Sequence, residues 1–147
     1  MEENKIFAIW LSILPGLTPT KIKKLIETYK SARKIYFISP SELKDEPLDE
    51  ITKQTLKNKN LDRAKYIASI CEKKGIDVLV YTDDYYPPLL RNLSNPPFLL
   101  YKKGRDIDYR SYPIASVVGS RILSDDGKSV TEKISYEMAR EGFIVVS

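Results

Sequence analysis

The sequence predicts an α/β protein in which a helical N-terminal module precedes the first part of a parallel β-sheet. Apolar residues recur at helical spacing through the first seventy or so positions. After Gly75, short β-rich runs replace that pattern. Near the C-terminus a strand, an amphipathic helix and a second strand follow one another, which is typical of a βαβ crossover. We therefore expect two domains, residues 1–72 and 73–147.

Capping residues predict where several of the helices begin. Thr18 precedes Pro19, which suits the first helical position because its missing N–H costs nothing there. Ser39 and Glu42 have the spacing of a capping box, and Asn60 is expected to cap a helix that ends at Gly75. The predicted helices lie at 4–14, from 19 onward, at 31–37, from 40 onward, within 48–57 and at 60–74.

Four short strands are expected in the second half. Val130, Ile134, Met138 and Ala139 should face inward from the helix between the last two strands. The final strand runs to the last residue, where an open α/β sheet places its next ligand-binding loop. We therefore expect a fragment of a longer protein, with four strands and one crossover. The strands are predicted at 76–81, 98–101, 113–118 and 143–147.

Composition excludes several kinds of chemistry. The chain has 147 residues, 30% of them charged, a net charge of +4 and no histidine. Catalysis by Ser-His-Asp or Cys-His groups is therefore excluded, as are histidine-ligated metals. Cys71 is the only cysteine, so there is no intrachain disulfide and no cysteine zinc site. The N-terminal apolar stretch is shorter than the ~20 residues that span a bilayer. We expect a cytoplasmic protein without membrane contact, metal or cofactor.

The junction "IASVVGSRILSDDGKSV", residues 114–130, is the strongest candidate site. A strand that leads into a helix points the helix's N–H groups at whatever lies above the strand end, which favours an anion. Gly119 allows close backbone approach, Ser120 offers a hydroxyl, and Arg121 offers a bidentate fork for phosphate. Ser124 is the expected N-cap, and Lys128 lies about one turn into the helix. These five residues form the predicted phosphate site.

A purely structural reading of the same junction stays open. Gly-Ser-Arg can be an ordinary sharp turn, and Asp125 and Asp126 would repel a phosphate while suiting a helix start. The segment matches neither the dinucleotide fingerprint nor a Walker A loop.

Three weaker candidates lie elsewhere. From Lys21 to Lys34 there are six basic residues and one acid after a Pro-Gly turn, which suggests either a helix-hairpin-helix or a solvated lysine face. Thr18 stands where that hairpin usually has its second glycine. Tyrosines interleaved with basic residues could stack single-stranded bases or pack at domain edges. These tyrosines are Tyr81, Tyr85, Tyr86, Tyr101, Tyr109 and Tyr112.

The pairs Asp83–Asp84 and Asp125–Asp126 are more typical of turns and caps than of a Mg²⁺ site.

The order of these motifs resembles the DNA-processing protein A family (DprA, also called Smf). The resemblance rests on "LPGLTPTKIKKLIETY", on the Tyr-Pro to Leu-Tyr-x-x-Gly segment at 86–104, on "VVGSR" and on "GFIVVS". It implies a sterile-alpha-motif-like helical domain followed by the N-terminal part of an extended Rossmann-like domain.

The resemblance also implies a function. Proteins of this family bind single-stranded DNA without sequence preference and load a RecA-type recombinase onto it, notably in natural transformation, and they are not known as enzymes. Gly119, Ser120 and Arg121 match the turn that contributes to the family's basic pocket. The family's glycine-rich loop, remaining sheet and homodimer surface would follow Ser147. We therefore expect weak DNA binding and an exposed sheet edge.

Two other functions remain as alternatives. Rossmann-like phosphoribohydrolases that act on nucleoside monophosphates also open with a strand and a Gly-Ser turn. A protein-interaction module that works through the helical domain is the second alternative.

Overall fold

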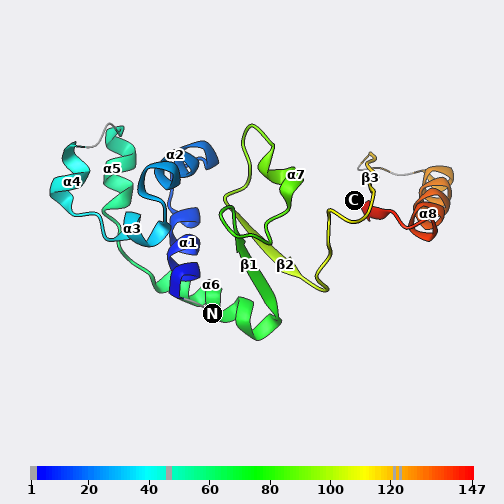
Figure 1. Cartoon of the computed structure of the whole chain (residues 1–147), viewed down its shortest axis with the longest axis horizontal. Coiled ribbons are helices and arrows are strands. Elements are labelled where there is room, and N and C mark those ends of the chain that lie inside the picture. The colour runs from blue at the N-terminus through cyan, green and yellow to red at the C-terminus, as the bar shows by residue number, and fades with distance from the viewer. Residues whose placement is uncertain (1–2, 46–47, 121, 123) are drawn as a thin grey trace. The chain divides into compact units, whose positions relative to one another are not determined.

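The computed structural model describes residues 3–45, 48–120, 122 and 124–147, which fall into two compact units, 1–104 and 105–147. Figure 1 labels most of their helices and strands. The predicted α/β class is confirmed, since helices are combined with one parallel and one antiparallel strand pair. The elements are α1 (Glu3–Ile13), α2 (Pro19–Tyr29), α3 (Ala32–Tyr36), α4 (Pro40–Asp45), α5 (Glu50–Leu56), α6 (Asp62–Lys74), β1 (Ile76–Val80), α7 (Pro88–Arg91), β2 (Leu99–Lys103), β3 (Ile114–Ser116), α8 (Asp125–Arg140) and β4 (Ile144–Val146).

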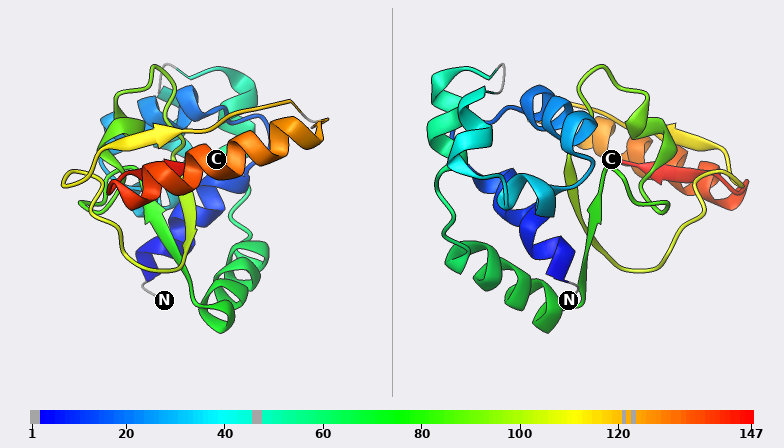
Figure 2. Two further views of the ribbon diagram at one scale, coloured as in Figure 1. Left: turned by 90° about the vertical axis from the view of Figure 1, so that its right-hand side faces the viewer. Right: turned by 60° about the vertical axis from the view of Figure 1, so that its left-hand side comes forward.

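Helix α1 is the centre of the first unit. Its residues 7–11 are all buried, because α1 contacts α3, α6 and both strands of the β1–β2 pair. A helix surrounded on most sides must be apolar on most sides. The indole N–H of Trp10 donates to the carbonyl of Asn58 at 2.9 Å, so this buried ring keeps its polar atom paired. Figure 2 shows α1, in blue, beside the chain that leads through α6 to β1.

Two of the predicted helix starts are confirmed by their hydrogen bonds. Thr18 is the N-cap of α2, and its hydroxyl oxygen accepts the Lys21 N–H at 3.3 Å. Ser39 accepts the Glu42 N–H at 3.2 Å while its own N–H donates to the Glu42 carboxylate at 2.9 Å. These bonds hold the pKa of Glu42 below its usual value.

The start of α6 differs slightly from the prediction. Leu61, not Asn60, occupies the N-cap position and makes no side-chain cap bond. The Asn60 side chain accepts the Asp62 N–H at 2.7 Å. Asn60 therefore satisfies a backbone donor of the first helical turn from the position just before the N-cap. Gly75 ends α6 in the left-handed conformation with φ +60°, as predicted from its position.

Strands β1 and β2 pair antiparallel, from Ile76 opposite Lys103 to Val80 opposite Leu99. Val78, Val80 and Phe98 are buried in the same cluster as the helices, so the strand pair and the helical bundle share one core. The chain returns from β1 to β2 through α7.

The second unit is a single parallel crossover. Strands β3 and β4 pair in parallel, from Ile114 opposite Ile144 to Ser116 opposite Val146, and α8 contacts β4 (Figure 2). The predicted strand–helix–strand crossover is thereby confirmed. Among the residues that the structure describes, the strands form two separate pairs.

The predicted inward face of α8 is not buried. Val130 and Ile134 are 56% and 46% exposed, and only Met138 is half-buried. The prediction was wrong because β3 and β4, the strands joined by α8, contribute only three residues each and offer little surface to cover the helix.

The predicted domain boundary after residue 72 stays a prediction. The two compact units are divided by spatial contacts, after Gly104, whereas the predicted domains are divided by sequence pattern. Across the described residues, none of the helices combines the length and apolar character that crossing a membrane requires.

Candidate nucleic-acid interface

The predicted phosphate site lies on the turn that leaves β3. The Val117 N–H donates to the Val146 carbonyl at 2.8 Å, which extends the strand pairing by one residue before the chain departs. Ser116 lies opposite Val146, so β3 and β4 end at the same edge. The turn therefore stands at the carboxyl edge of a parallel pair, where open α/β sheets hold their ligands.

Gly119 has free space above its backbone. A methyl group built on this residue would meet no atom within 4 Å, and Gly119 is not among the glycines with positive φ. The local backbone therefore does not require glycine here. An open, unshielded backbone is what close approach of a ligand needs.

Ser120 uses its hydroxyl within the turn. Its oxygen accepts the Ile122 N–H at 3.3 Å, and the residue is exposed. The accepting bond occupies a lone pair and leaves the hydroxyl hydrogen able to donate to a ligand oxygen. Arg121, the predicted phosphate fork, lies outside the described residues.

Ser124 is confirmed as the N-cap of α8. Its backbone is extended, with φ −78° and ψ 157°, and its hydroxyl oxygen accepts the Gly127 N–H at 3.1 Å. The Lys128 N–H donates to the Ser124 carbonyl at 2.9 Å, which closes the first turn. Ser124 and Lys128 are thus one helical turn apart, and both are exposed.

The charges near this turn are mixed. The Lys128 ammonium is 4.0 Å from the Glu132 carboxylate, and both side chains are about two-thirds exposed, so this pair is weak. Asp125 and Asp126 lie in the first turn of α8 and are exposed. They stabilise the positive end of the helix dipole and oppose an incoming phosphate.

The Tyr-Pro to Pro-Pro segment holds a structural tyrosine. Tyr86 is fully buried, and its hydroxyl donates to the Pro97 carbonyl at 2.6 Å. Tyr81 packs edge-on against it at 5.7 Å, and the Arg91 guanidinium lies 5.6 Å from its ring centre. Burial raises the pKa of Tyr86 above its ordinary value. Tyr86 therefore cannot stack a base, whereas Tyr85, at 86% exposure, is accessible.

The Pro-Gly turn after α1 contacts α5, although Pro15 and Gly16 are both exposed. The Thr55 hydroxyl donates to the Pro15 carbonyl at 3.2 Å, and a methyl group on Gly16 would lie 3.6 Å from Ile51. Thr18 uses its side chain to cap α2. The Pro15 carbonyl and the Thr18 side chain are thus both used within the helical unit, which favours the packed-bundle interpretation over a DNA-binding hairpin.

The acidic pairs do not assemble a metal site. Within the part of the chain that the structure describes, no group of three or more acidic or cysteine side chains is placed to hold a metal ion. The Asp83 carboxylate instead accepts the Val80 N–H at 2.9 Å and closes a turn.

Sequence reasoning missed one exposed aromatic group. The Arg33 guanidinium lies 5.7 Å from the ring centre of Phe37, which is 62% exposed. The signal was available as an arginine and a phenylalanine four residues apart on a short helix.

Comparison with known proteins identifies the family. A family model described as DNA recombination-mediator protein A matches residues 77–147, which contain the whole β3–α8–β4 crossover. Protein Smf of Synechocystis sp. is 31% identical over 153 residues, covering 98% of this chain and 38% of its own length. DNA processing protein DprA of Bacillus subtilis is 26% identical over 102 residues, covering 67% of this chain and 34% of its own length.

Residues 77–147 thus match a family of the recombination-mediator class. Taken with the two relatives, this match identifies the chain as a member of the DprA/Smf family, as the sequence motifs predicted. The chain spans just over a third of the length of each relative.

Proposed function

We propose that this chain takes part in DNA uptake and recombination by binding the backbone of single-stranded DNA at the turn between β3 and α8. The observation that carries the proposal is the exposed set of donors at the carboxyl edge of β3 and β4. Ser120 and Ser124 supply hydroxyl groups, and Gly119 leaves the backbone open. This turn lies inside the segment that the family model matches.

The proposed mechanism is electrostatic and independent of base sequence. Phosphate oxygens accept from the hydroxyl groups of the turn and from N–H groups of the first turn of α8, while Lys128 and Arg121 supply positive charge. Such contacts release counterions from the DNA. The log of the binding constant then falls with the log of salt concentration by about 0.7 per phosphate neutralised.

The family supports a proposal for the role of the bound strand. The family's description as a recombination mediator supports delivery of the strand to a RecA-type recombinase, and it supports a binding role more than catalysis. A cytoplasmic setting fits that role. The rate at which a RecA-type protein coats an oligothymidine, with and without this chain, would test the delivery step.

The experiment that tests DNA binding is fluorescence anisotropy of a labelled oligothymidine across a salt series. Arg121→Ala should weaken binding and flatten the salt dependence. Arg140→Ala is the matched control, because Arg140 lies at the opposite end of α8 and pairs with Glu137 at 3.3 Å. Equal binding by the unaltered chain and Arg121→Ala would remove Arg121 from the proposed site. Absence of any binding by the unaltered chain would contradict the proposal.

A further inference from the structure

The excess positive charge of the chain lies in the unit that does not contain the β3–α8 turn. Residues 1–104 contain 18 Lys and Arg against 13 Asp and Glu, a side-chain charge of +5. Residues 105–147 contain six against seven, a charge of −1. Attraction of a polyanion at long range therefore comes mainly from the first unit.

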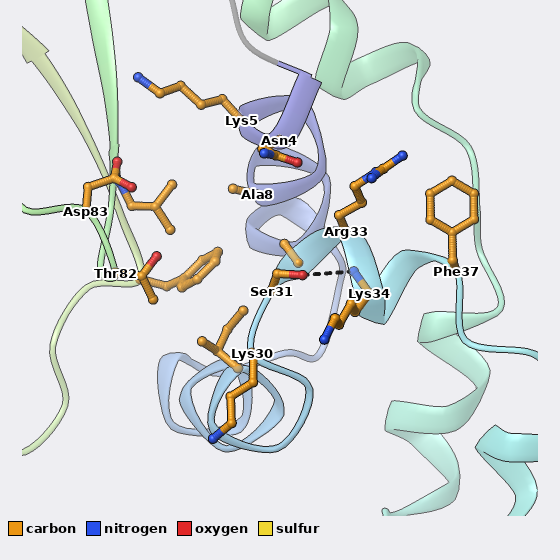
Figure 3. Close-up of a pocket in the computed structure, with 14 residues that line it drawn as sticks. Asn4, Lys5, Ala8, Lys30, Ser31, Arg33, Lys34, Phe37, Thr82 and Asp83 are labelled. Atoms are coloured by element: carbon orange, nitrogen blue, oxygen red, sulfur yellow. Dashed lines mark hydrogen bonds between the residues drawn. The ribbon is translucent and has the colours of Figure 1, made fainter.

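Four of the 18 basic residues of the first unit line one cavity. The cavity has a volume of about 510 Å³ and is lined by residues of α1, α2, α3 and the segment that follows β1. Such a volume lies within the ~300–1,000 Å³ typical of ligand pockets. Figure 3 shows the charged side chains extending outward around Ala8 and Ser31. Its basic lining residues are Lys5, Lys30, Arg33 and Lys34.

The lining also contains one acid and an apolar part. Asp83 comes from the segment after β1, across the cavity from Arg33 and Phe37 (Figure 3), and its carboxylate already accepts the Val80 N–H. Ala8 and Phe98 are buried and line the same space. Four cations against one carboxylate leave the cavity net positive, with an apolar floor. The Lys30 ammonium also donates to the Glu27 carbonyl at 2.7 Å, which leaves its charge unchanged.

An anchored aromatic ring stands at one side of the cavity. Phe37 packs edge-on against Phe7 at 5.7 Å and against Tyr36 at 5.1 Å, which fixes the ring. It nevertheless remains 62% exposed, with the Arg33 guanidinium 5.7 Å from its centre. A fixed, exposed ring beside a guanidinium is a surface on which a nucleic-acid base can stack.

We infer that this cavity is a second contact for single-stranded DNA, separate from the β3–α8 turn. One base stacks on Phe37 beside Arg33, and the phosphates on either side of that base are reached by Lys30 and Lys34. The combination of an exposed ring, an apolar floor and surrounding cations favours a single strand. Duplex DNA keeps its bases stacked within itself, and an acidic peptide makes no use of the ring. The inference rests on the proposed function.

The test compares two matched pairs of basic residues by anisotropy with the same oligothymidine. Arg33→Gln with Lys34→Gln removes two cations from the last turn of α3, and Lys73→Gln with Lys74→Gln removes two from the last turn of α6. All four residues are exposed, and only the first pair lines the cavity. The cavity pair should weaken binding on the order of tenfold and lower the salt slope by about 1.4, whereas the control pair should change neither.

A second variant isolates the stacking contact. Phe37→Leu keeps an apolar side chain against Phe7 and removes the ring, so binding should fall by about fivefold or more with an unchanged salt slope. Amide chemical shifts, recorded as oligothymidine is added to the full chain, give a readout that does not depend on the variants folding. Residues 30–37 should shift together with residues 119–128.

Several outcomes would overturn the inference. Equal losses of oligothymidine affinity in both double variants would mean that the basic residues attract DNA diffusely. A cavity double variant that binds like the unaltered chain would show that the cavity does not contact DNA, and the β3–α8 proposal would still stand. Unshifted amides at residues 30–37, with shifts at 119–128, would do the same. Competition by polyglutamate as strong as that by unlabelled oligothymidine would mean a general polyanion site. Absence of any binding by the unaltered chain would overturn this inference and the proposed function together.

Discussion

Lys21 and Asp49 form a salt bridge, with 3.1 Å between the ammonium nitrogen and a carboxylate oxygen. The same carboxylate caps α5, because it accepts the backbone N–H and the hydroxyl of Thr52 at 2.9 and 2.8 Å. Thr52 is almost fully buried. Asp49 thus links the basic helix α2 to the start of α5 and accepts a hydrogen bond from the buried hydroxyl of Thr52.

The first prediction concerns acid stability. The bonds from Thr52, aided by Lys21, lower the pKa of Asp49 to about 2. A carboxyl group with a lowered pKa stabilises the folded state above its unfolded pKa near 4, and this contribution is lost as pH falls toward about 2. Asp49→Asn should therefore unfold at lower urea concentration at pH 7, and its difference from the unaltered chain should shrink between pH 4 and pH 2.

Urea unfolding at several pH values measures this difference. Glu42 and Asp108 also have lowered pKa values, so the comparison must use the difference between the two proteins and not either curve alone. A difference that stays constant down to pH 2 would contradict the assigned role of Asp49.

The second prediction separates two glycines. Gly119→Ala should leave stability unchanged, because its φ is not positive and the added methyl meets no atom. Gly142→Ala should cost about 1 kcal/mol, because Gly142 has φ +85° and a side chain is strained there. Urea unfolding measures both costs. If a DNA backbone approaches Gly119 closely, Gly119→Ala should also weaken oligothymidine binding, and Gly142→Ala should not.

The third prediction uses two lysines of α8. Lys128→Gln should weaken oligothymidine binding and lower the salt slope by about 0.7, because Lys128 lies in the first turns beside Ser124. Lys133→Gln carries the same charge change further along the same helix and should have no effect. Anisotropy at several salt concentrations tests the pair, and equal slopes for both variants would place Lys128 outside the interface.

The fourth prediction concerns the Tyr-Pro segment. Tyr86→Phe removes the donor to the Pro97 carbonyl and should destabilise the chain by about 1–2 kcal/mol without changing DNA binding. Tyr85→Phe changes an exposed neighbour and should leave stability unchanged. Thermal and urea unfolding distinguish them. Loss of DNA binding in Tyr86→Phe at unchanged stability would assign that tyrosine to the interface after all.

Local features of this chain were predictable because they depend on neighbouring residues alone. The capping bonds of Thr18, of Ser39 with Glu42 and of Ser124 follow from residue type and spacing within one helical turn. The parallel crossover was predictable for a similar reason, since chain length and handedness leave few ways to connect two strands through a helix.

Features that depend on distant residues were not predictable. The antiparallel partner of β1 is β2, about twenty residues further on, and no local signal distinguishes this from a parallel arrangement. The cavity beside Phe37 exists because α1, α3 and the segment after β1 meet there. The basic run was visible in the sequence, but which of its cations face that cavity depends on packing.

The shared core of the helices and the β1–β2 pair has a practical consequence for exchanging parts between relatives. The match to the recombination-mediator family model begins at residue 77, inside β1, whereas the compact unit continues to Gly104. A chimera joined at residue 77 would graft foreign strands onto helices whose interior was shaped around Val78, Val80 and Phe98. A chimera joined after Gly104 would transplant an intact interior. The start of the family-model match and the boundary between the compact units therefore differ by almost thirty residues.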